Sequence, residues 1–300
     1  MISVIVCTYN RAHYLADTLD HLLHQSAAID DFEVLVINNK STDDTEDVCT
    51  QFSTKNPAFP FRYIVEMAQG LSFARNSGIK EAKGDVLTFI DDDAFAQVDF
   101  IKHIQEHFES NAQTLAVGGK IIPKYEDGEP RWMSKYLLPL VAALDMGDKI
   151  KPFPKSKFPI GANMSMRKEV FDDYGIFDVN LGRKGSTLEG SEEKDLFSRI
   201  TKSGANIMYI PQTVVHHIIP PKRVSLSYIK NQAIGIGKSE RTRTLQKGRS
   251  TFLLFLIGES IKWAGTIVLS IYYFLKLKPA KAGMLLRFRA FVSRGILLGD

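Results

Sequence analysis

The stretch that decides the fold reads Val86-Leu87-Thr88-Phe89-Ile90-Asp91-Asp92-Asp93. Its apolar run follows the turn-like Lys83-Gly84-Asp85 and predicts a buried strand, which ends in three adjacent carboxylates. Carboxylates side by side at a strand end are costly, because each one raises the pKa of its neighbours. A divalent cation removes this cost, and oxygen ligands of this kind suit Mg²⁺ or Mn²⁺. The alternative for the same residues is a solvated acidic turn.

Strand-like and helix-like segments alternate through the first part of the chain. Continuous β-branched runs such as residues 2–7 are typical of buried parallel strands, and apolar residues at helical spacing follow them. This alternation predicts an α/β fold with a mainly parallel sheet and helices on both faces. Ligands of such sheets bind at the carboxyl ends of the strands, where the polar clusters of this sequence are expected. We expect strands at 2–7, 33–37, 61–65, 86–90 and 115–118, and helices at 15–24 and 97–110, with two more ending near residues 52 and 82.

The segments that follow are less regular. Residues 121–159 are rich in Pro, Lys and Gly and predict a long loop that faces the substrate. Residues 185–191 also predict a loop, and Glu192 opens a further helix. Two short strands are expected at 206–210 and 213–218.

Cysteine content and charge narrow the class of protein. Two cysteines in 300 residues do not make a disulfide framework and predict a reducing compartment. No basic leader precedes the first apolar run, so we expect no secretory signal. Residues 1–220 carry 23 basic and 31 acidic side chains, whereas residues 221–300 carry 15 basic and 3 acidic ones. The basic end predicts an anionic partner, either nucleic acid or a membrane surface.

Of these two partners, the sequence of residues 221–300 favours a membrane surface. Residues 252–275 are strongly apolar and about 36 Å long as a helix, enough to span a bilayer. Polar residues at spacings of 3, 4 and 4 form one seam along it and disfavour immersion in lipid. Basic and apolar residues then alternate, which suits peripheral or monotopic attachment to an anionic leaflet; one C-terminal span or a soluble packing element are alternatives. No nucleic-acid-binding module accompanies the charge, so nucleic acid is not expected. The seam consists of Glu259, Lys262, Thr266 and Ser270.

Seven segments, taken in chain order, carry a family resemblance. They are Ser3-Val4-Ile5-Val6-Cys7-Thr8-Tyr9-Asn10-Arg11, residues 38–45, Ala74-Arg75-Asn76, Asp91-Asp92-Asp93, Gly161-Ala162-Asn163, residues 190–195 and His217. With these segments the chain resembles the family 2 glycosyltransferases, an inverting, nucleotide-sugar-dependent group with the GT-A fold, which is Rossmann-like. The resemblance implies a catalytic domain at residues 1–220. Residues 221–300 are then a helical, membrane-associating extension.

The resemblance implies a donor site at the ends of the first two strands. Thr8 and Tyr9 would line the nucleotide pocket, with Arg11 near the diphosphate. Family members usually have Asp where this chain has Asn38, at a position that contacts the nucleobase. An amide oxygen still accepts a hydrogen bond from a pyrimidine N3–H, but the NH₂ group allows another base. A UDP-sugar is therefore the default expectation for the donor.

The resemblance also implies where the diphosphate and the metal bind. Arg75 would approach the pyrophosphate, because a guanidinium fork matches phosphate oxygens. Asp91 and Asp92 would face the ribose and the nucleotide. Asp93 would bind Mn²⁺ or Mg²⁺, with Asp91 and His217 as further candidate ligands. The alternative for His217 is an ordinary histidine at the end of a strand.

The second acidic cluster is expected to supply the general base. Inverting transfer needs a carboxylate that takes the proton of the acceptor hydroxyl, while a metal stabilises the departing nucleoside diphosphate. Family members usually have Glu-Asp where this chain has Glu192-Glu193, and alignment on Gly190 places Glu193 at the base position. The extra methylene leaves Glu192 or Asp195 as alternatives, although Asp195 is expected to support the helix start. A plain acidic first turn of a helix is the alternative without chemistry.

Two residues are candidates for the acceptor side. Asn163 lies where the family places acceptor or donor contacts, although holding the backbone is its simpler role. Trp132, in the middle loop, either stacks on an acceptor sugar or anchors the loop. The expected acceptor is a saccharide or a lipid-linked glycan, at the cytoplasmic face of a cell membrane.

Two functions of other classes are alternatives. A sugar-phosphate nucleotidyltransferase shares the doubly wound sheet, but it needs a glycine-rich basic loop after the first strand, which Thr8-Tyr9-Asn10-Arg11 lacks. A non-catalytic, membrane-attached glycan-binding domain does not need the acidic clusters at 91–93 and 192–193. The leading expectation is a glycosyltransferase of the EC 2.4 class that acts in polysaccharide biosynthesis at the cell envelope.

Overall fold

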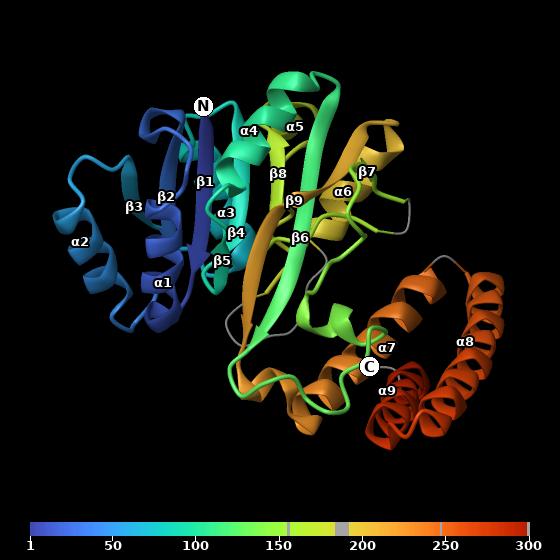
Figure 1. The fold of residues 1–300 in the computed structure, drawn as a ribbon. Helices are drawn as coiled ribbons and strands as arrows, with labels where there is room; N and C mark the ends of the chain where they lie inside the picture. Colours follow the sequence, from blue (N-terminus) through green and yellow to red (C-terminus); the bar gives the residue numbers. More distant parts are fainter. Residues whose placement is uncertain (155–156, 184–191, 247, 299–300) are drawn as a thin grey trace. The chain divides into compact units, whose positions relative to one another are not determined.

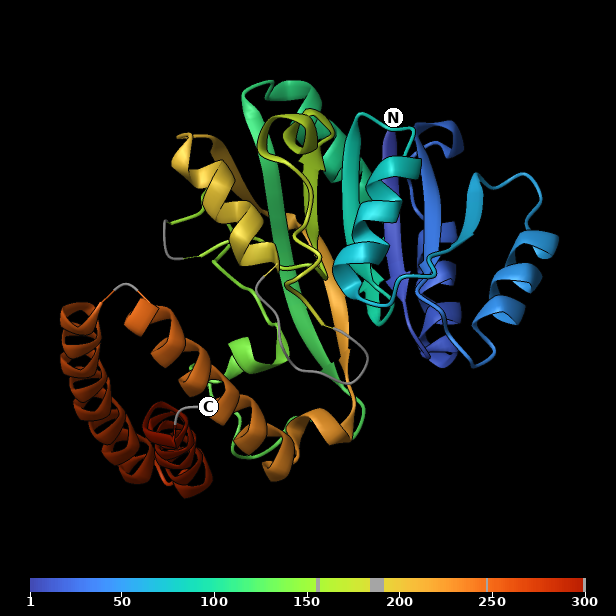
Figure 2. The same cartoon turned by 180° about the vertical axis from the view of Figure 1, so that it is seen from behind.

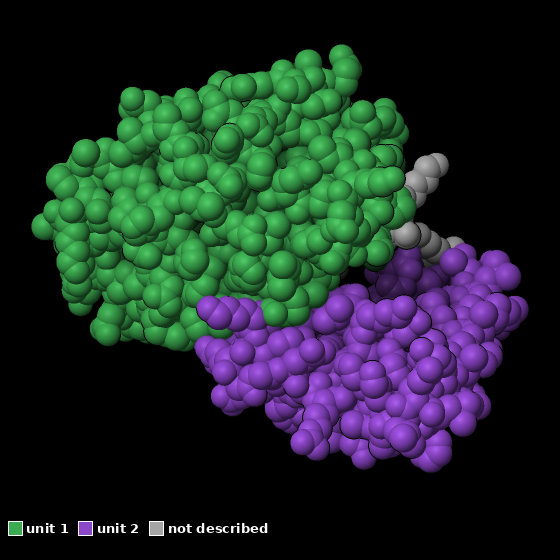
Figure 3. Space-filling model, in the orientation of Figure 1, with its two compact units in different colours: residues 1–123, 142–218 green, residues 124–141, 219–300 purple. Residues whose placement is uncertain are grey.

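The computed structural model describes residues 1–154, 157–183, 192–246 and 248–298. The chain forms two compact units (Figure 3). The first unit combines residues 1–123 with 142–218, and the second combines residues 124–141 with 219–300. The second unit therefore includes residues 124–141, which lie within the catalytic domain predicted from the sequence at residues 1–220.

The first unit is built on one mixed sheet. Among the described residues this sheet has nine strands, in the order β3-β2-β1-β4-β8-β6-β9-β5, with β7 paired to β9 (Figure 1). The first four in this order are parallel, and their buried β-branched residues explain why the sequence pattern predicts them. These strands are β1 (Ile2–Thr8), β2 (Phe32–Asn38), β3 (Phe61–Val65) and β4 (Val86–Asp91).

Antiparallel strands extend the sheet beyond β4. Strand β8 pairs antiparallel with β4 and with β6, and β9 pairs antiparallel with β5 and β7. The pairing of β9 with β5 places His217 opposite Ala94, so a segment more than 100 residues away in sequence lies next to the acidic end of β4. The strands are β5 (Ala94–Ala96), β6 (Thr114–Tyr125), β7 (Lys151–Pro152), β8 (Met164–Arg167) and β9 (Asn206–Ile219).

Helices cover both faces of the sheet. Helices α1 and α4 lie in front of it in Figure 1, and α3 and α6 lie in front of it when the molecule is seen from behind (Figure 2). This arrangement agrees with the α/β fold predicted from the alternation of strands and helices. The helices of this unit are α1 (Ala12–Leu23), α2 (Thr45–Lys55), α3 (Leu71–Glu81), α4 (Phe100–Ser110), α5 (Glu169–Tyr174) and α6 (Glu192–Lys202).

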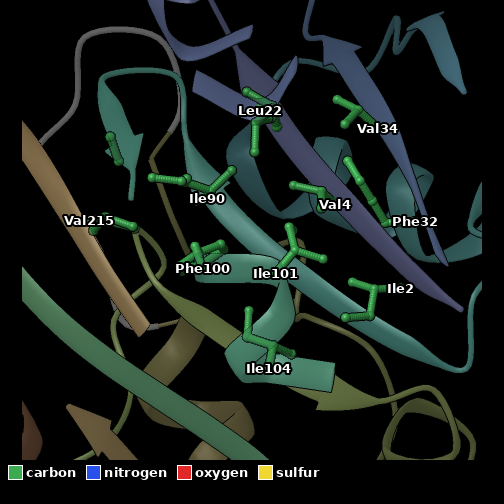
Figure 4. Close-up of a cluster of buried hydrophobic side chains, with 14 of the residues drawn as sticks. Ile2, Val4, Leu22, Phe32, Val34, Ile90, Phe100, Ile101, Ile104 and Val215 are labelled. Carbon is green, nitrogen blue, oxygen red and sulfur yellow. The ribbon is translucent and has the colours of Figure 1, made fainter. Parts of the chain in front are cut away.

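Two hydrophobic cores follow from the alternation of side chains along the strands. On one face, Val4 and Val34 pack with Leu22 of α1 and with Ile101 of α4 (Figure 4). On the other face, Ile5 belongs to a separate cluster with residues of α3, α5 and α6. Each fully buried Val, Leu or Ile side chain stabilises the fold by about 1.5–3 kcal/mol.

The structure corrects several predicted elements in the second half of this unit. Strand β6 continues to Tyr125 and thus enters the segment predicted as an irregular loop. Strand β9 is one strand of 14 residues, where two short strands at 206–210 and 213–218 were predicted. Pro211 and Gln212 lie between the two predicted strands, but the chain stays in the sheet there, and the buried Thr213 hydroxyl donates to the Ile210 carbonyl at 2.9 Å. Strand β5 has only three residues, too few for a periodic signal.

The second unit consists of helices. Helix α7 (Leu226–Gln246) packs on α9 (Pro279–Leu298), and α9 also packs on α8 (Arg249–Leu275). Two glycines make the close contact between α7 and α9. A Cβ atom at Gly237 would lie 2.1 Å from the carbonyl oxygen of Val292, and one at Gly295 would lie 2.1 Å from that of Ile234. Two short 3₁₀ helices, Leu138–Val141 and Pro221–Val224, complete this unit in the described residues.

Helix α8 has the reverse of the usual amphipathic pattern. Its buried residues are polar: Glu259, Thr266 and Ser270, three members of the seam seen in the sequence. Most of its large apolar side chains are exposed, with Leu254 at 70% and Ile261 at 68%, whereas Phe252, Phe255 and Leu256 near its start are half-buried against the other helices. Among the described helices, α8 alone is long and apolar enough to cross a bilayer.

Ion pairs and hydrogen bonds hold the buried polar seam of α8. Glu259 accepts from the Lys262 ammonium at 2.6 Å and from the Arg289 guanidinium of α9 at 3.1 Å. The Ser270 hydroxyl donates to the Ala282 carbonyl of α9 at 3.2 Å. These contacts join α8 and α9 into a hairpin and leave the apolar face of α8 exposed.

The contact between α7 and α9 yields a stability prediction. The substitution Gly237→Ala places a methyl group against the backbone of α9, and we expect it to destabilise the helical unit by about 1–3 kcal/mol. Gly235→Ala is the matched control on α7, since no heavy atom lies within 4 Å of its Cβ position, and alanine favours a helix by about 0.8–1.0 kcal/mol over glycine. Thermal unfolding of the full chain, followed by circular dichroism, compares the two. An equal effect at both positions would contradict the close helix contact.

Candidate functional site

The carboxyl ends of β1, β2 and β4 form the base of the candidate site. Thr8 at the end of β1 pairs in register with Asn38 at the end of β2, and Cys7 pairs with Asp91 at the end of β4. Parallel strands end at the same edge of a sheet, so the polar segments that follow them lie together. This agrees with the position predicted for the polar clusters.

Asp93 is the most deeply buried member of the first acidic cluster, with no solvent-exposed surface. Its Oδ2 atom lies 2.6 Å from Nη1 of Arg11, and its Oδ1 atom lies 3.2 Å from Nε2 of His217. The backbone fixes this arrangement, because the Ile218 N–H donates to the Asp93 carbonyl at 2.8 Å. The segment after β1, the segment after β4 and strand β9 therefore meet at one carboxylate.

Asp92 shares the same arginine. Its Oδ1 atom lies 3.0 Å from Nη1 of Arg11, and its carbonyl accepts a 2.7 Å hydrogen bond from the buried Thr18 hydroxyl of α1. Burial raises the pKa of Asp92 to about 7, against the opposing effect of the Arg11 guanidinium. Burial by itself would lower the pKa of Arg11, but the carboxylates of Asp92 and Asp93 raise it. Arg11 thus stays charged and compensates the acidic cluster.

The donor atoms of Asp91, Asp93 and His217 fit one divalent cation. One ligand atom from each residue lies within 4.8 Å of the others. Two carboxylates and one imidazole form an oxygen and nitrogen donor set, which suits Mn²⁺ and leaves coordination positions for water or phosphate. His216, the neighbouring residue in β9, pairs with Phe95, whereas His217 pairs with Ala94, so the two imidazoles point to opposite faces of the strand. The structure thus brings together the three residues that the sequence named as candidate metal ligands.

The segment after β2 is tied to the segment after β1. The Asn38 amide donates to the Tyr63 hydroxyl at 2.7 Å, and its Oδ1 atom accepts from the Ser41 N–H at 2.8 Å. Asn10, with a φ of 55°, accepts from the Thr42 N–H at 2.7 Å. These bonds give the two loops one fixed conformation.

Several residues named from the sequence lie along these loops. Thr8 is buried at the end of β1, and Tyr9 beside it is half-buried. Tyr63, on β3, was not among the predicted site residues. Its role as the partner of Asn38 depends on the pairing of β2 with β3 and has no local signal in the sequence.

Arg75 of α3 holds both carboxylates of the second acidic cluster. Its Nη1 atom lies 3.0 Å from Oε1 of Glu192, and its Nη2 atom lies 2.9 Å from Oε1 of Glu193. The Gly161 N–H donates a second hydrogen bond to Oε1 of Glu193 at 3.0 Å. The aromatic ring of Phe177 lies 5.2 Å below the guanidinium carbon, a contact that the sequence did not predict. The structure therefore gives Arg75 carboxylate partners, whereas the resemblance implied pyrophosphate.

Glu193 and Glu192 differ in their exposure to solvent, and the pKa of Glu193 is shifted. Burial raises the pKa of Glu193, Arg75 lowers it, and the nearby Glu192 raises it again. The Glu193 side chain is 19% exposed and that of Glu192 only 5%, so Glu193 is the more accessible carboxylate. A partly exposed carboxylate with a raised pKa, fixed by two hydrogen-bond donors, is suited to take a proton from a bound hydroxyl group.

Gly161 leaves the space that the contact between Arg75 and Glu193 needs. A Cβ atom at this position would lie 2.0 Å from Nη2 of Arg75 and 2.3 Å from Oε1 of Glu193. The Gly161-Ala162-Asn163 segment thus acts at the site through its backbone.

Three other predicted residues have structural partners or lie elsewhere. Asp195 accepts from Arg199 at 3.1 Å on the surface of α6, as expected for a residue that supports the helix. Asn163 is buried, and its amide donates to the carbonyls of Thr213 and Lys120 at 2.8 and 3.2 Å. Trp132 belongs to the second unit. Gly190, on which the acidic pair was aligned, lies outside the described residues.

The chain is similar to known glycosyltransferases. The family model described as "Glycosyl transferase family 2" matches residues 3–175. A curated protein of Haloferax volcanii, the glucosyl-dolichyl phosphate glucuronosyltransferase, is 26% identical over 247 residues, which cover 81% of this chain and 77% of that protein.

Solved structures share the fold. The mannosyltransferase PcManGT from Pyrobaculum calidifontis, in complex with GDP-Man and Mn²⁺, matches with a TM-score of 0.65 and 17% identity over 99% of this chain and 86% of that chain. S. aureus TarS 1–349 in complex with UDP matches with a TM-score of 0.56 and 18% identity, over 78% of this chain and 65% of that one. At these identities the likeness supports the fold alone.

The donor atoms of the first cluster yield a metal-binding prediction. We expect His217→Ala to weaken Mn²⁺ binding by about tenfold or more, because the substitution removes one ligand atom. His216→Ala is the matched control, since it removes an imidazole from the opposite face of the same strand. Calorimetric titration of the full chain with MnCl₂ measures both. Equal Mn²⁺ affinity in the two variants would exclude His217 as a ligand.

Proposed function

The chain belongs to glycosyl transferase family 2 and is a glycosyltransferase that uses a nucleotide sugar, and from this premise we propose an inverting, metal-assisted transfer with Glu193 as the general base. The observation that carries the proposal is the pair of charged clusters at one end of the sheet. Asp91, Asp93 and His217 form one cluster, and Arg75 with the two glutamates forms the other. Family membership also favours glycosyl transfer over the nucleotidyltransferase and glycan-binding alternatives.

The proposed transfer forms one bond and breaks another at the anomeric carbon. The acceptor hydroxyl oxygen attacks this carbon while the bond to the nucleoside diphosphate breaks on the opposite side, so the configuration inverts. Glu193 takes the hydroxyl proton through its carboxylate, which Arg75 and the Gly161 N–H hold in place. Asp195 is directed to Arg199, and Glu192 is more deeply buried, so neither is as well placed for this role.

The acidic cluster of Asp91, Asp93 and His217 is proposed to bind the leaving diphosphate through a metal ion. Asp91, Asp93 and His217 would hold Mn²⁺ or Mg²⁺, which supplies positive charge to the departing phosphate oxygens. Arg11 pairs with the carboxylates of Asp92 and Asp93, so its guanidinium lies beside this cluster. Arg11 is therefore proposed as the protein's own cation at the diphosphate, while Arg75 orients the base.

A UDP-sugar is the proposed donor. Asn38 stands at the nucleobase position implied by the family, and its NH₂ group is used by Tyr63. The Asn38 carbonyl oxygen retains a second lone pair beside its bond to Ser41, and this lone pair can accept the N3–H of uracil. S. aureus TarS binds UDP in its solved structure, whereas PcManGT binds GDP-Man. Asp92 and the Thr8-Tyr9 segment would complete the nucleotide side.

The proposed acceptor is a saccharide or a lipid-linked glycan at the cytoplasmic face of the cell membrane. The Haloferax volcanii relative is named for a dolichyl phosphate acceptor. The exposed apolar face of α8 suits contact with lipid, because its polar residues are buried against α9. We propose that α8 lies at the membrane surface and does not span the bilayer. The reason is that α9 packs on α8 and carries Arg287, Arg289 and Arg294, whose charges are costly inside lipid.

Substitution of the proposed base tests the mechanism. We expect Glu193→Gln to lower kcat by about 10²–10⁴-fold, because the amide cannot accept the hydroxyl proton but keeps the shape of the side chain. Asp195→Asn is the matched control on the same helix and should change kcat by only a few-fold, because Asp195 pairs with Arg199. Release of UDP or GDP from a panel of nucleotide sugars, with MnCl₂, provides the measurement. Unchanged turnover in Glu193→Gln would rule out this residue as the base.

The raised pKa of Glu193 gives a signed pH dependence. The base must be deprotonated, so kcat/KM should fall as the pH drops through a pKa above the ordinary range for glutamate. Arg75 lowers that pKa, so Arg75→Gln should move the acid limb of the profile to higher pH. Arg75→Lys keeps the charge and should move the limb less. A pH–rate profile that is identical in the wild type and in Arg75→Gln would contradict the coupling of these two residues.

A further inference from the structure

The second unit has a cavity of its own, with a volume of about 260 Å³. Its walls are hydrocarbon or aromatic except for one charged side chain, Arg287. Met284 is buried, Trp132 is half-buried and Leu226 is 47% exposed, so the cavity has a firm wall and an accessible side. The residues that line it are Trp132, Leu226, Pro279, Ala280, Gly283, Met284 and Arg287.

Arg287 is the polar group that would select a ligand. Arg289, two positions further along α9, pairs with Glu259 at 3.1 Å. Within the described residues, no carboxylate lies within ion-pair distance of Arg287. A guanidinium beside an apolar wall favours an anion, and its fork matches the oxygens of a phosphate.

The surroundings of the cavity add positive charge. Its wall includes Pro279 and Ala280, the first residues of α9, where the helix dipole is positive. Lys278 and Lys281 flank these residues in sequence, and residues 260–298 contain seven basic side chains and no acidic one. Such a site excludes cationic ligands and attracts anionic ones.

The wall chemistry also excludes a sugar or a nucleotide as the main occupant. The lining side chains include no hydroxyl, amide or carboxylate group, which sugar hydroxyls need as partners. The apolar approach points to a hydrocarbon chain. Phe274, Leu275 and Leu277 are 65%, 75% and 89% exposed, and they lead along the chain directly to Pro279 at the cavity wall.

We propose that this cavity binds the phosphate end of an amphiphilic lipid, with the phosphate at Arg287 and the first part of the hydrocarbon chain against Trp132 and Met284. The proposal rests on the proposed function, because it gives the lipid-linked acceptor a binding site for its lipid phosphate. The same chemistry is offered by a polyprenyl phosphate carrier and by a membrane phosphatidate. This role replaces sugar stacking as the function of Trp132.

Gly283 allows the cavity to be filled without disturbing the fold. No heavy atom lies within 4 Å of its Cβ position, so a methionine side chain at this position extends into the cavity. Gly235 on α7 also has an open Cβ position and does not line the cavity, so Gly235→Met is the matched control. Both substitutions replace glycine in a helix, which favours the helix.

Fluorescence of Trp132 reports the binding directly. The chain has two tryptophans, so the full-length Trp263→Phe protein in a non-ionic detergent carries Trp132 alone. We expect farnesyl phosphate to change its emission with saturation, and Arg287→Gln to weaken binding by about tenfold to a hundredfold. Gly283→Met should abolish the change, and Gly235→Met should leave it intact. Dihexanoyl phosphatidate distinguishes the sources: binding of farnesyl phosphate alone indicates the carrier lipid, and equal binding of both indicates lipid phosphates in general.

Three results would overturn the proposal. Farnesol or laurate binding as tightly as farnesyl phosphate would remove the role of the phosphate. Inorganic phosphate competing at the same concentration would reduce the site to one for a free anion. Unchanged affinity in Gly283→Met would place the ligand elsewhere. The titration contains no nucleotide sugar and requires no sugar transfer. The Glu193→Gln protein should therefore bind farnesyl phosphate like the wild type. If Glu193 proves not to be the base, the result of this titration is unaffected.

Discussion

The carboxylate of Asp93, fully enclosed by protein, is the constraint on which the first unit depends. A buried ion costs several kcal/mol unless partners compensate it. The compensation comes from Arg11 after β1 and His217 on β9, whose contacts with Asp93 are 2.6 and 3.2 Å long. The second acidic cluster follows the same rule, with Arg75 between Glu192 and Glu193. Both clusters therefore bring segments that are distant in sequence to one end of the sheet, and these segments form the proposed catalytic site.

Burial of charge also organises the helical unit, and there it leaves apolar side chains exposed at the surface. Glu259 of α8 is compensated by Lys262 on the same helix and by Arg289 on α9. Because the polar side of α8 is used for this contact, its apolar side remains exposed. A helix that buries its polar seam is suited to a lipid surface, where exposed apolar groups gain stability. The catalytic chemistry and the proposed membrane contact thus both depend on where compensated charges are buried.

Comparison of particular elements shows how much the sequence could predict. The strand Phe61–Val65 agrees with its prediction, and the candidate metal ligands Asp91, Asp93 and His217 lie close together. Strands β6 and β9 were predicted too short or divided, because they lie in antiparallel pairs whose pattern is interrupted by Pro and Gly. The resemblance implied that Arg75 approaches pyrophosphate, but its contacts in the structure are with two carboxylates. Asn163 contacts backbone carbonyls, which agrees with the simpler of its two predicted roles.

By itself the sequence determined the α/β class, the acidic end of β4, the order of the site segments and the unusual polar seam of α8. These features are local, since they depend on periodicity and on spacing along the chain. Only the tertiary structure decided which charges compensate one another. The distances between Arg75 and the two glutamates, the space left by Gly161 and the cavity beside Arg287 arise from segments that meet across the fold. Such contacts depend on packing between distant residues, and no local pattern encodes them.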